Sequence, residues 1–73
     1  MSKGYARPRL QHVDEDRFHV FADPSGELVG GIQAEAGGTW SSLVGPKTTG
    51  LWPHRQAAAE ALLMQAGYEV SRS

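Results

Sequence analysis

The chain has 73 residues, a formal net charge of −1 and no cysteine. These values exclude disulfide cross-links and a Cys/His zinc site, and they leave no overall basic excess for phosphate contacts. A domain of this size buries only about 60% of its unfolded surface, so we expect association with a partner or a second copy. No apolar run approaches the ~20 residues of a membrane span, and the N-terminus lacks a secretory signal, which predicts a cytoplasmic protein with no membrane contact.

Residues 1–9 are expected to form a flexible basic tail, ahead of one small α+β domain over residues 10–70. The tail carries Arg7 and Arg9 around Pro8 and has little apolar surface to bury. Two interpretations stay open: a basic arm that docks on an anionic partner, or a solvated end.

Three segments are predicted to be strands. Residues 17–23 alternate in polarity and are rich in aromatic and β-branched residues. A turn at 24–26 leads to a second strand over 28–36, and a third is expected over 39–44. Within the second strand, the pair Gly30-Gly31 is typical of a bulge or of a close backbone approach. Residues 45–50 are expected to be a polar connector.

The clearest element is a helix from about Pro53 to Ala66. Proline suits the first helical turn, the interior holds good helix formers, and Gly67 can adopt the left-handed conformation that ends a helix. The predicted fold class is therefore α+β: a three-stranded antiparallel meander packed on one C-terminal helix (βββα). A short extra strand is allowed at either end, one of them around residues 68–70.

Helical spacing gives the predicted helix two apolar stripes. The inward stripe consists of Ala59, Leu62, Leu63 and Ala66. The second consists of Ala57, Ala61, Met64 and Tyr68, and is interpreted either as a partner or dimer contact or as water-tolerant alanine helix. On the face of the sheet away from the helix, alternation exposes Phe21 and Val29 together, which also favours self-association or partner binding.

No enzyme motif is present. There is no cysteine nucleophile, nucleophile elbow, phosphate loop or zinc-protease motif, and the three histidines lack the spacing of metal ligands. The sequence therefore predicts a non-catalytic protein with no cofactor and no metal.

One cationic cluster is a candidate anion or nucleic-acid site. It lies in the connector and the first helical turn, where free N–H groups attract anions, and comprises Lys47, Thr48, Trp52, His54 and Arg55. The anion is either a phosphate or a partner's carboxylate. Trp52 is interpreted either as a contact residue or as a core residue over the sheet edge.

Residues 17–66 loosely resemble the second half of double-stranded-RNA-binding domains. The resemblance rests on three strands followed by the helix sequence Gln-Ala-Ala-Ala-Glu-Ala-Leu-Leu. The arrangement is also similar to the DNA-binding domains of plant ERF factors and phage integrases, in which the sheet or helix start touches phosphates. The chain departs from the first pattern by lacking a first helix and a basic cluster. It departs from the second by offering Gln33 and Glu35 on the open sheet face, and is assigned to neither family.

The leading functional hypothesis is a non-catalytic protein-interaction or regulatory module, of the small accessory type that phages and plasmids encode. It is expected to act as a homodimer that binds another protein. The alternative is a small βββα nucleic-acid-binding domain, which would use Arg7 and Arg9 of the tail together with the connector and the helix N-terminus.

Overall fold

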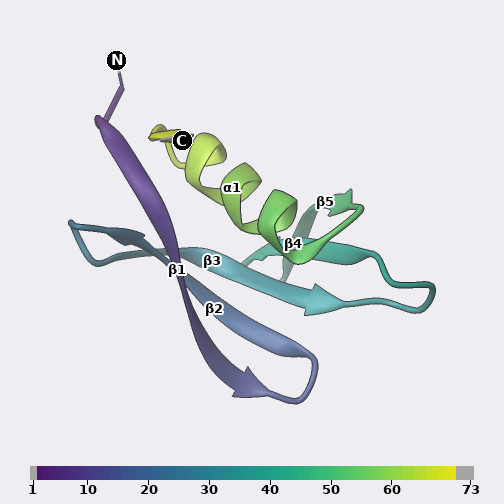
Figure 1. Ribbon diagram of the computed structural model, residues 1–73. Helices are drawn as coiled ribbons and strands as arrows, with labels where there is room; N and C mark the ends of the chain where they lie inside the picture. Colours follow the sequence, from purple (N-terminus) through teal and green to yellow (C-terminus); the bar gives the residue numbers. More distant parts are fainter. Residues whose placement is uncertain (1, 71–73) are drawn as a thin grey trace.

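The computed structural model describes residues 2–70, which form one curled sheet and one helix (Figure 1). The elements in chain order are β1 (Tyr5–Asp14), β2 (Arg17–Asp23), β3 (Glu27–Ala34), β4 (Trp40–Val44), β5 (Lys47–Trp52), α1 (Arg55–Gln65) and β6 (Glu69–Val70). Residue 1 of the expected tail lies outside the described part of the chain.

All six strands belong to a single sheet, in the order β5-β4-β3-β2-β1-β6. Neighbours pair in antiparallel fashion except β1 and β6, which are parallel through Tyr5 opposite Glu69 and Ala6 opposite Val70. The prediction of an α+β fold with a three-stranded antiparallel sheet is therefore wrong. The fold is a six-stranded mixed sheet, curled into a half-barrel, with one short helix.

β5 was not predicted, and β1 is much longer than the short extra strand allowed at that end of the chain; both carry many exposed polar residues. β1 begins at Tyr5, so residues 5–9 are strand rather than tail, and β5 covers most of the expected connector. The apolar pattern of both strands is weak, because the inward positions of β1 begin with the small or cyclic residues Ala6 and Pro8, and β5 begins with polar residues and Gly50. Gly45, at φ +60°, allows the tight turn that returns the chain from β4 into β5.

Three bulges bend the sheet, each made by one residue that has no partner on the neighbouring strand. These residues are Val13 in β1, Val29 in β3 and Thr49 in β5. Because a bulge increases the local twist, three of them in neighbouring ladders curl the sheet around α1. The bulge expected at Gly30-Gly31 is confirmed, since Val29 precedes Gly30 at φ +150°.

α1 begins later than expected. The N-cap is His54, whose Nδ1 accepts a hydrogen bond from the backbone N–H of Ala57 at 3.2 Å, so Pro53 precedes the helix. The predicted end is confirmed: Gly67 is left-handed at φ +98°, and it donates to the Met64 carbonyl while Tyr68 donates to that of Leu63. These two bonds are a Schellman ending.

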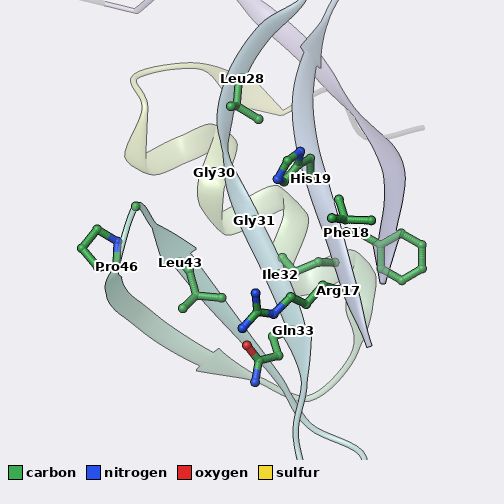
Figure 2. Close-up of a pocket in the computed structure, with 12 residues that line it drawn as sticks. Arg17, Phe18, His19, Leu28, Gly30, Gly31, Ile32, Gln33, Leu43 and Pro46 are labelled. Carbon is green, nitrogen blue, oxygen red and sulfur yellow. The ribbon is translucent and has the colours of Figure 1, made fainter. Parts of the chain in front are cut away.

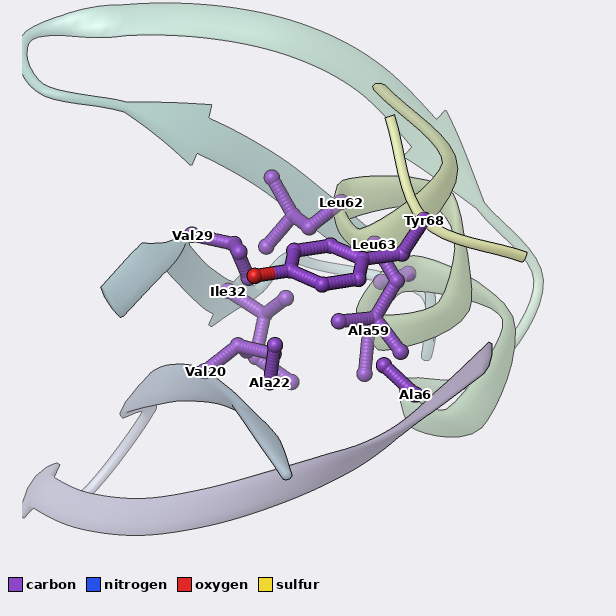
Figure 3. Packing of buried hydrophobic residues seen from close by; sticks show 10 residues of the cluster. Ala6, Val20, Ala22, Val29, Ile32, Ala59, Leu62, Leu63 and Tyr68 are labelled. Carbon is purple, nitrogen blue, oxygen red and sulfur yellow. The ribbon is translucent and has the colours of Figure 1, made fainter. Parts of the chain in front are cut away.

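The core lies between α1 and the concave face of the sheet (Figure 3). Ala59, Leu62 and Leu63 of the inward stripe are fully buried, as predicted, and Ala66 is half-buried. They pack against side chains of β1, β2 and β3, chiefly Ala6, Val20, Ala22, Val29 and Ile32.

Tyr68 ties the end of α1 to the turn between β2 and β3. Its ring is buried in the core, and its hydroxyl donates to Glu27 Oε1 and lies 3.0 Å from Ser25 Oγ. Lys3 reaches the same carboxylate at 3.3 Å. The phenol and ammonium groups hold the pKa of Glu27 below its ordinary value, because both stabilise the charged carboxylate.

Candidate binding face of the sheet

The face of the sheet away from α1, here called the outer face, is covered by no other element of residues 2–70. It contains a hollow of about 480 Å³ over β2, β3 and β4 (Figure 2). Leu28 and Leu43 contribute apolar walls, and Arg17 and Gln33 lie together at one end.

The hollow exists because the centre of the sheet carries no side chain there. A Cβ at Gly31 would lie 4.0 Å from the ring of its cross-strand partner His19, so the vacant position faces outward. A Cβ at Gly30 would instead meet Leu62 of α1 at 2.9 Å. The glycine pair therefore serves both faces: Gly30 lets the helix approach, and Gly31 leaves the outer face open.

The bulge at Val29 also decides which apolar residues reach this face. Simple alternation along 28–36 predicts Leu28 inward and Val29 outward. With Val29 inserted, the phase changes: Val29 is buried in the core and Leu28 is 54% exposed on the outer face. The sequence prediction of Val29 as an exposed contact residue is therefore wrong for its side chain.

Arg17 gives one end of the hollow a positive charge, and among the described residues that line it none is acidic. The acidic residues 14–16 precede Arg17 along the chain, outside the lining. Within residues 2–70 the ion pairs are Lys3–Glu27 and Arg9–Asp23, so the Arg17 guanidinium is not paired with a carboxylate there.

Two further arginines continue the outer face onto β1. Ala6 and Leu10 face the core, so the alternate residues Arg7 and Arg9 face outward. Arg9 lies over the ring of Phe21 at 4.7 Å and forms a 3.1 Å ion pair with Asp23. Phe21 lies on the outer face, but it is half-buried rather than exposed as expected, with the Arg9 guanidinium over its ring.

The structure divides the predicted contact stripe of the helix. Ala61 and Tyr68 are buried in the core, Ala57 is half-buried, and Met64 is 50% exposed. The wide curl of the sheet explains why Ala61 and Tyr68 are buried. Strands at both ends of the sheet lie beside α1 and cover a second side of the helix.

The predicted anion cluster also separates into distinct locations. Lys47 and Thr48 are exposed at the start of β5, whereas His54 and Arg55 lie beyond the other end of that strand. The ring nitrogen Nδ1 of His54 is used as the helix cap, and Arg55 lies over the Phe18 ring at 5.4 Å.

Trp52 fits the core interpretation. Its ring is half-buried against the core and covers Gly50, where a Cβ would lie 2.7 Å from the indole. Its Nε1 donates to the buried Ser42 Oγ at 2.9 Å. The indole is therefore engaged within the fold.

Local alternation and motif spacing do not mark Arg17, Gly31, Leu28 or Leu43 as site residues. The available signal was the pair Gly30-Gly31, which predicts a bulge and hence a change of phase along the strand. Applying that phase change places Leu28 on the same side as His19 and leaves an open position beside it.

Groups of three or more potential metal ligands do not occur within residues 2–70, and α1, the helix of that region, is too short to span a membrane.

The candidate site is an open sheet face with an apolar, cationic hollow. Comparison with protein-family models, curated proteins and solved structures yields no match for this chain.

Proposed function

We propose that the protein is a non-catalytic interaction module that binds another protein through the outer face of its sheet. The observation that carries this proposal is the asymmetry of the sheet. The inner face is covered by α1, whereas the outer face has a hollow of about 480 Å³ bordered by apolar side chains.

Exposed apolar area supports this proposal. Leu28 and Val13 line the hollow, and each leaves more than half of its side chain exposed. Burying a leucine side chain is worth about 1.5–3 kcal/mol, so covering the hollow gives a partner a substantial share of its binding free energy.

A foreign partner suits this face better than a second copy. In a twofold contact between two outer faces, residues close to the axis meet their own equivalents, so a contact centred on the hollow places Arg17 of one copy beside Arg17 of the other. Like charges at such a contact are unfavourable, whereas a partner with carboxylates gains from them.

A nucleic acid is a second candidate, favoured by the common outward orientation of Arg7, Arg9 and Arg17. Fluorescence anisotropy with labelled duplex and single-stranded oligonucleotides tests it. A nucleic-acid binder loses affinity steeply between about 50 mM and 200 mM salt, and Arg7→Glu reduces that slope. The interaction proposal expects no such binding.

Site-specific photo-crosslinking in the native cells tests the proposed function directly. A photoreactive residue at Leu28 is expected to give a protein adduct, and the same residue at the exposed Gln65 on α1 is the matched control. Adducts from Gln65 alone, or a nucleic-acid adduct at Leu28, contradict the proposal.

A further inference from the structure

We propose that the occupant of the outer-face hollow is an acidic segment of the partner protein, in which one large apolar side chain lies next to carboxylates. The apolar side chain enters above Gly31, and a carboxylate pairs with Arg17. This inference rests on the proposed function and specifies the chemistry of the partner.

The shape and lining of the hollow select an apolar side chain. Its walls are aliphatic at Leu28 and Leu43, and its floor at Gly31 exposes backbone with no side chain above it. A large aliphatic or aromatic side chain fills such a space and removes apolar surface of both molecules from water.

The charge of the hollow selects an acidic neighbour for that side chain. Arg17 and Gln33 lie at one end of the hollow, where a guanidinium and an amide offer several N–H donors to one carboxylate (Figure 2). A planar guanidinium pairs with a carboxylate through two parallel hydrogen bonds, which fixes orientation as well as charge.

The same lining argues against a nucleic acid in this place. Bases bind to sheets by stacking on exposed aromatic rings. Phe18, the phenyl ring at this hollow, packs against Trp40 with a centroid distance of 6.0 Å on the core side. The walls left for a ligand are aliphatic at Leu28 and Leu43, with the single imidazole of His19 beside them, which suits one protein side chain better than a run of stacked bases.

The experiment is selection of binders from a random peptide library displayed on phage, with the full chain as bait. The selected peptides are expected to share a large apolar residue flanked by aspartate or glutamate. Their affinity is expected to fall as salt is raised, because one contact is an ion pair.

Matched variants then locate the binding site. Arg17→Glu is expected to weaken binding about tenfold or more, and Arg55→Glu, the same charge change on the other side of the sheet, less than about twofold. Leu28→Ser is expected to weaken binding several-fold, whereas Leu51→Ser, at a leucine that is also more than half exposed but outside the hollow, has little effect. Thermal melting of each variant verifies that it is folded.

The other outcomes of the selection contradict either the acidic partner alone or the proposed function as well. Peptides that lack acids but depend on Leu28 overturn the acidic partner and leave the proposed function standing. Failure to select any peptide, or peptides indifferent to both Arg17 and Leu28, overturns both. Self-association abolished by Leu28→Ser replaces the foreign partner with a second copy.

Discussion

Gly30 of β3 and Leu62 of α1 are in such close contact that a Cβ on Gly30 would lie 2.9 Å from Leu62 Cδ2. The same Cβ would collide with the backbone carbonyl of Leu43, and φ at Gly30 is +150°. This contact seats the helix on the bulged strand. It also gives the fold a position that only glycine can occupy.

We predict that Gly30→Ala lowers the free energy of unfolding by about 2–4 kcal/mol, from backbone strain and overpacking together. Gly31→Ala is the control, because its Cβ points outward and meets the Phe18 carbonyl at 3.3 Å and the His19 ring at 4.0 Å. Its effect is expected to stay within about 1 kcal/mol. Urea denaturation measures both, and equal losses would contradict the assignment of the two glycines to opposite faces.

Ser42 is fully buried, and its hydroxyl joins the indole of Trp52 to Thr49. Ser42→Ala leaves a buried indole N–H without its partner, which is expected to cost about 1–3 kcal/mol of stability. In the double variant with Trp52→Phe the donor is also absent, so a double-mutant cycle should show a favourable coupling. Additive losses would mean that this hydrogen bond contributes nothing.

Glu27 gives the fold a pH dependence. Its pKa is held below the ordinary 4.5, first by the hydrogen bond from Tyr68 and then by Lys3. Since the pKa is lower in the folded state, the stabilisation is complete above pH 4.5. It is lost as the pH falls from 4.5 through the folded value.

Thermal melts across this acidic range test the Glu27 prediction, with Glu27→Gln as the comparison. The variant is expected to lose less stability on acidification than the native chain. NMR titration of the Glu27 carboxyl provides a direct check, and a midpoint at or above 4.5 in the folded protein contradicts the assignment.

The helix start can be improved. His54 caps α1 with a ring nitrogen, and the first turn contains no acidic residue. Aspartate is a better N-cap and interacts favourably with the helix dipole, so His54→Asp is expected to stabilise the fold by about 0.5–1 kcal/mol. His54→Ala should instead destabilise it. Chemical denaturation distinguishes the two, and stabilisation by alanine would refute the capping role.

Local sequence patterns were sufficient for some elements. The strand at residues 17–23, now β2, was predicted with its observed bounds, and the left-handed Gly67 at the helix end was predicted from residue chemistry alone. Such features depend on neighbours within a few residues. They are specified by φ preferences, alternation and capping.

The sheet's full width was not predictable in the same way. β1 and β5 carry few large apolar residues at their inward positions, where β1 has Ala6 and Pro8 and β5 has Gly50, so their alternation is hard to recognise in the sequence. The parallel contact of β1 with β6 joins the two ends of the chain, which local periodicity does not encode.

The candidate site was predicted only in part. Phe21 was correctly expected on the uncovered face, but the bulge exchanged the roles of Leu28 and Val29. One inserted residue changes the phase between the two parts of a strand, so Leu28 and Val29 exchanged sides while Ile32 kept its predicted inward position. The prediction of a second, exposed contact stripe on the helix was wrong for a different reason. Whether Ala61 and Tyr68 are exposed depends on how far the sheet curls.

The most direct test of the outer face as the docking surface is NMR chemical-shift mapping of the full chain with a selected acidic peptide. The account predicts that the amide signals of Arg17, Gly31 and Leu43 shift on titration, while those of Met64 and Gln65 on α1 remain unchanged. Shifts confined to α1, with the β2–β4 amides unaffected, would contradict it.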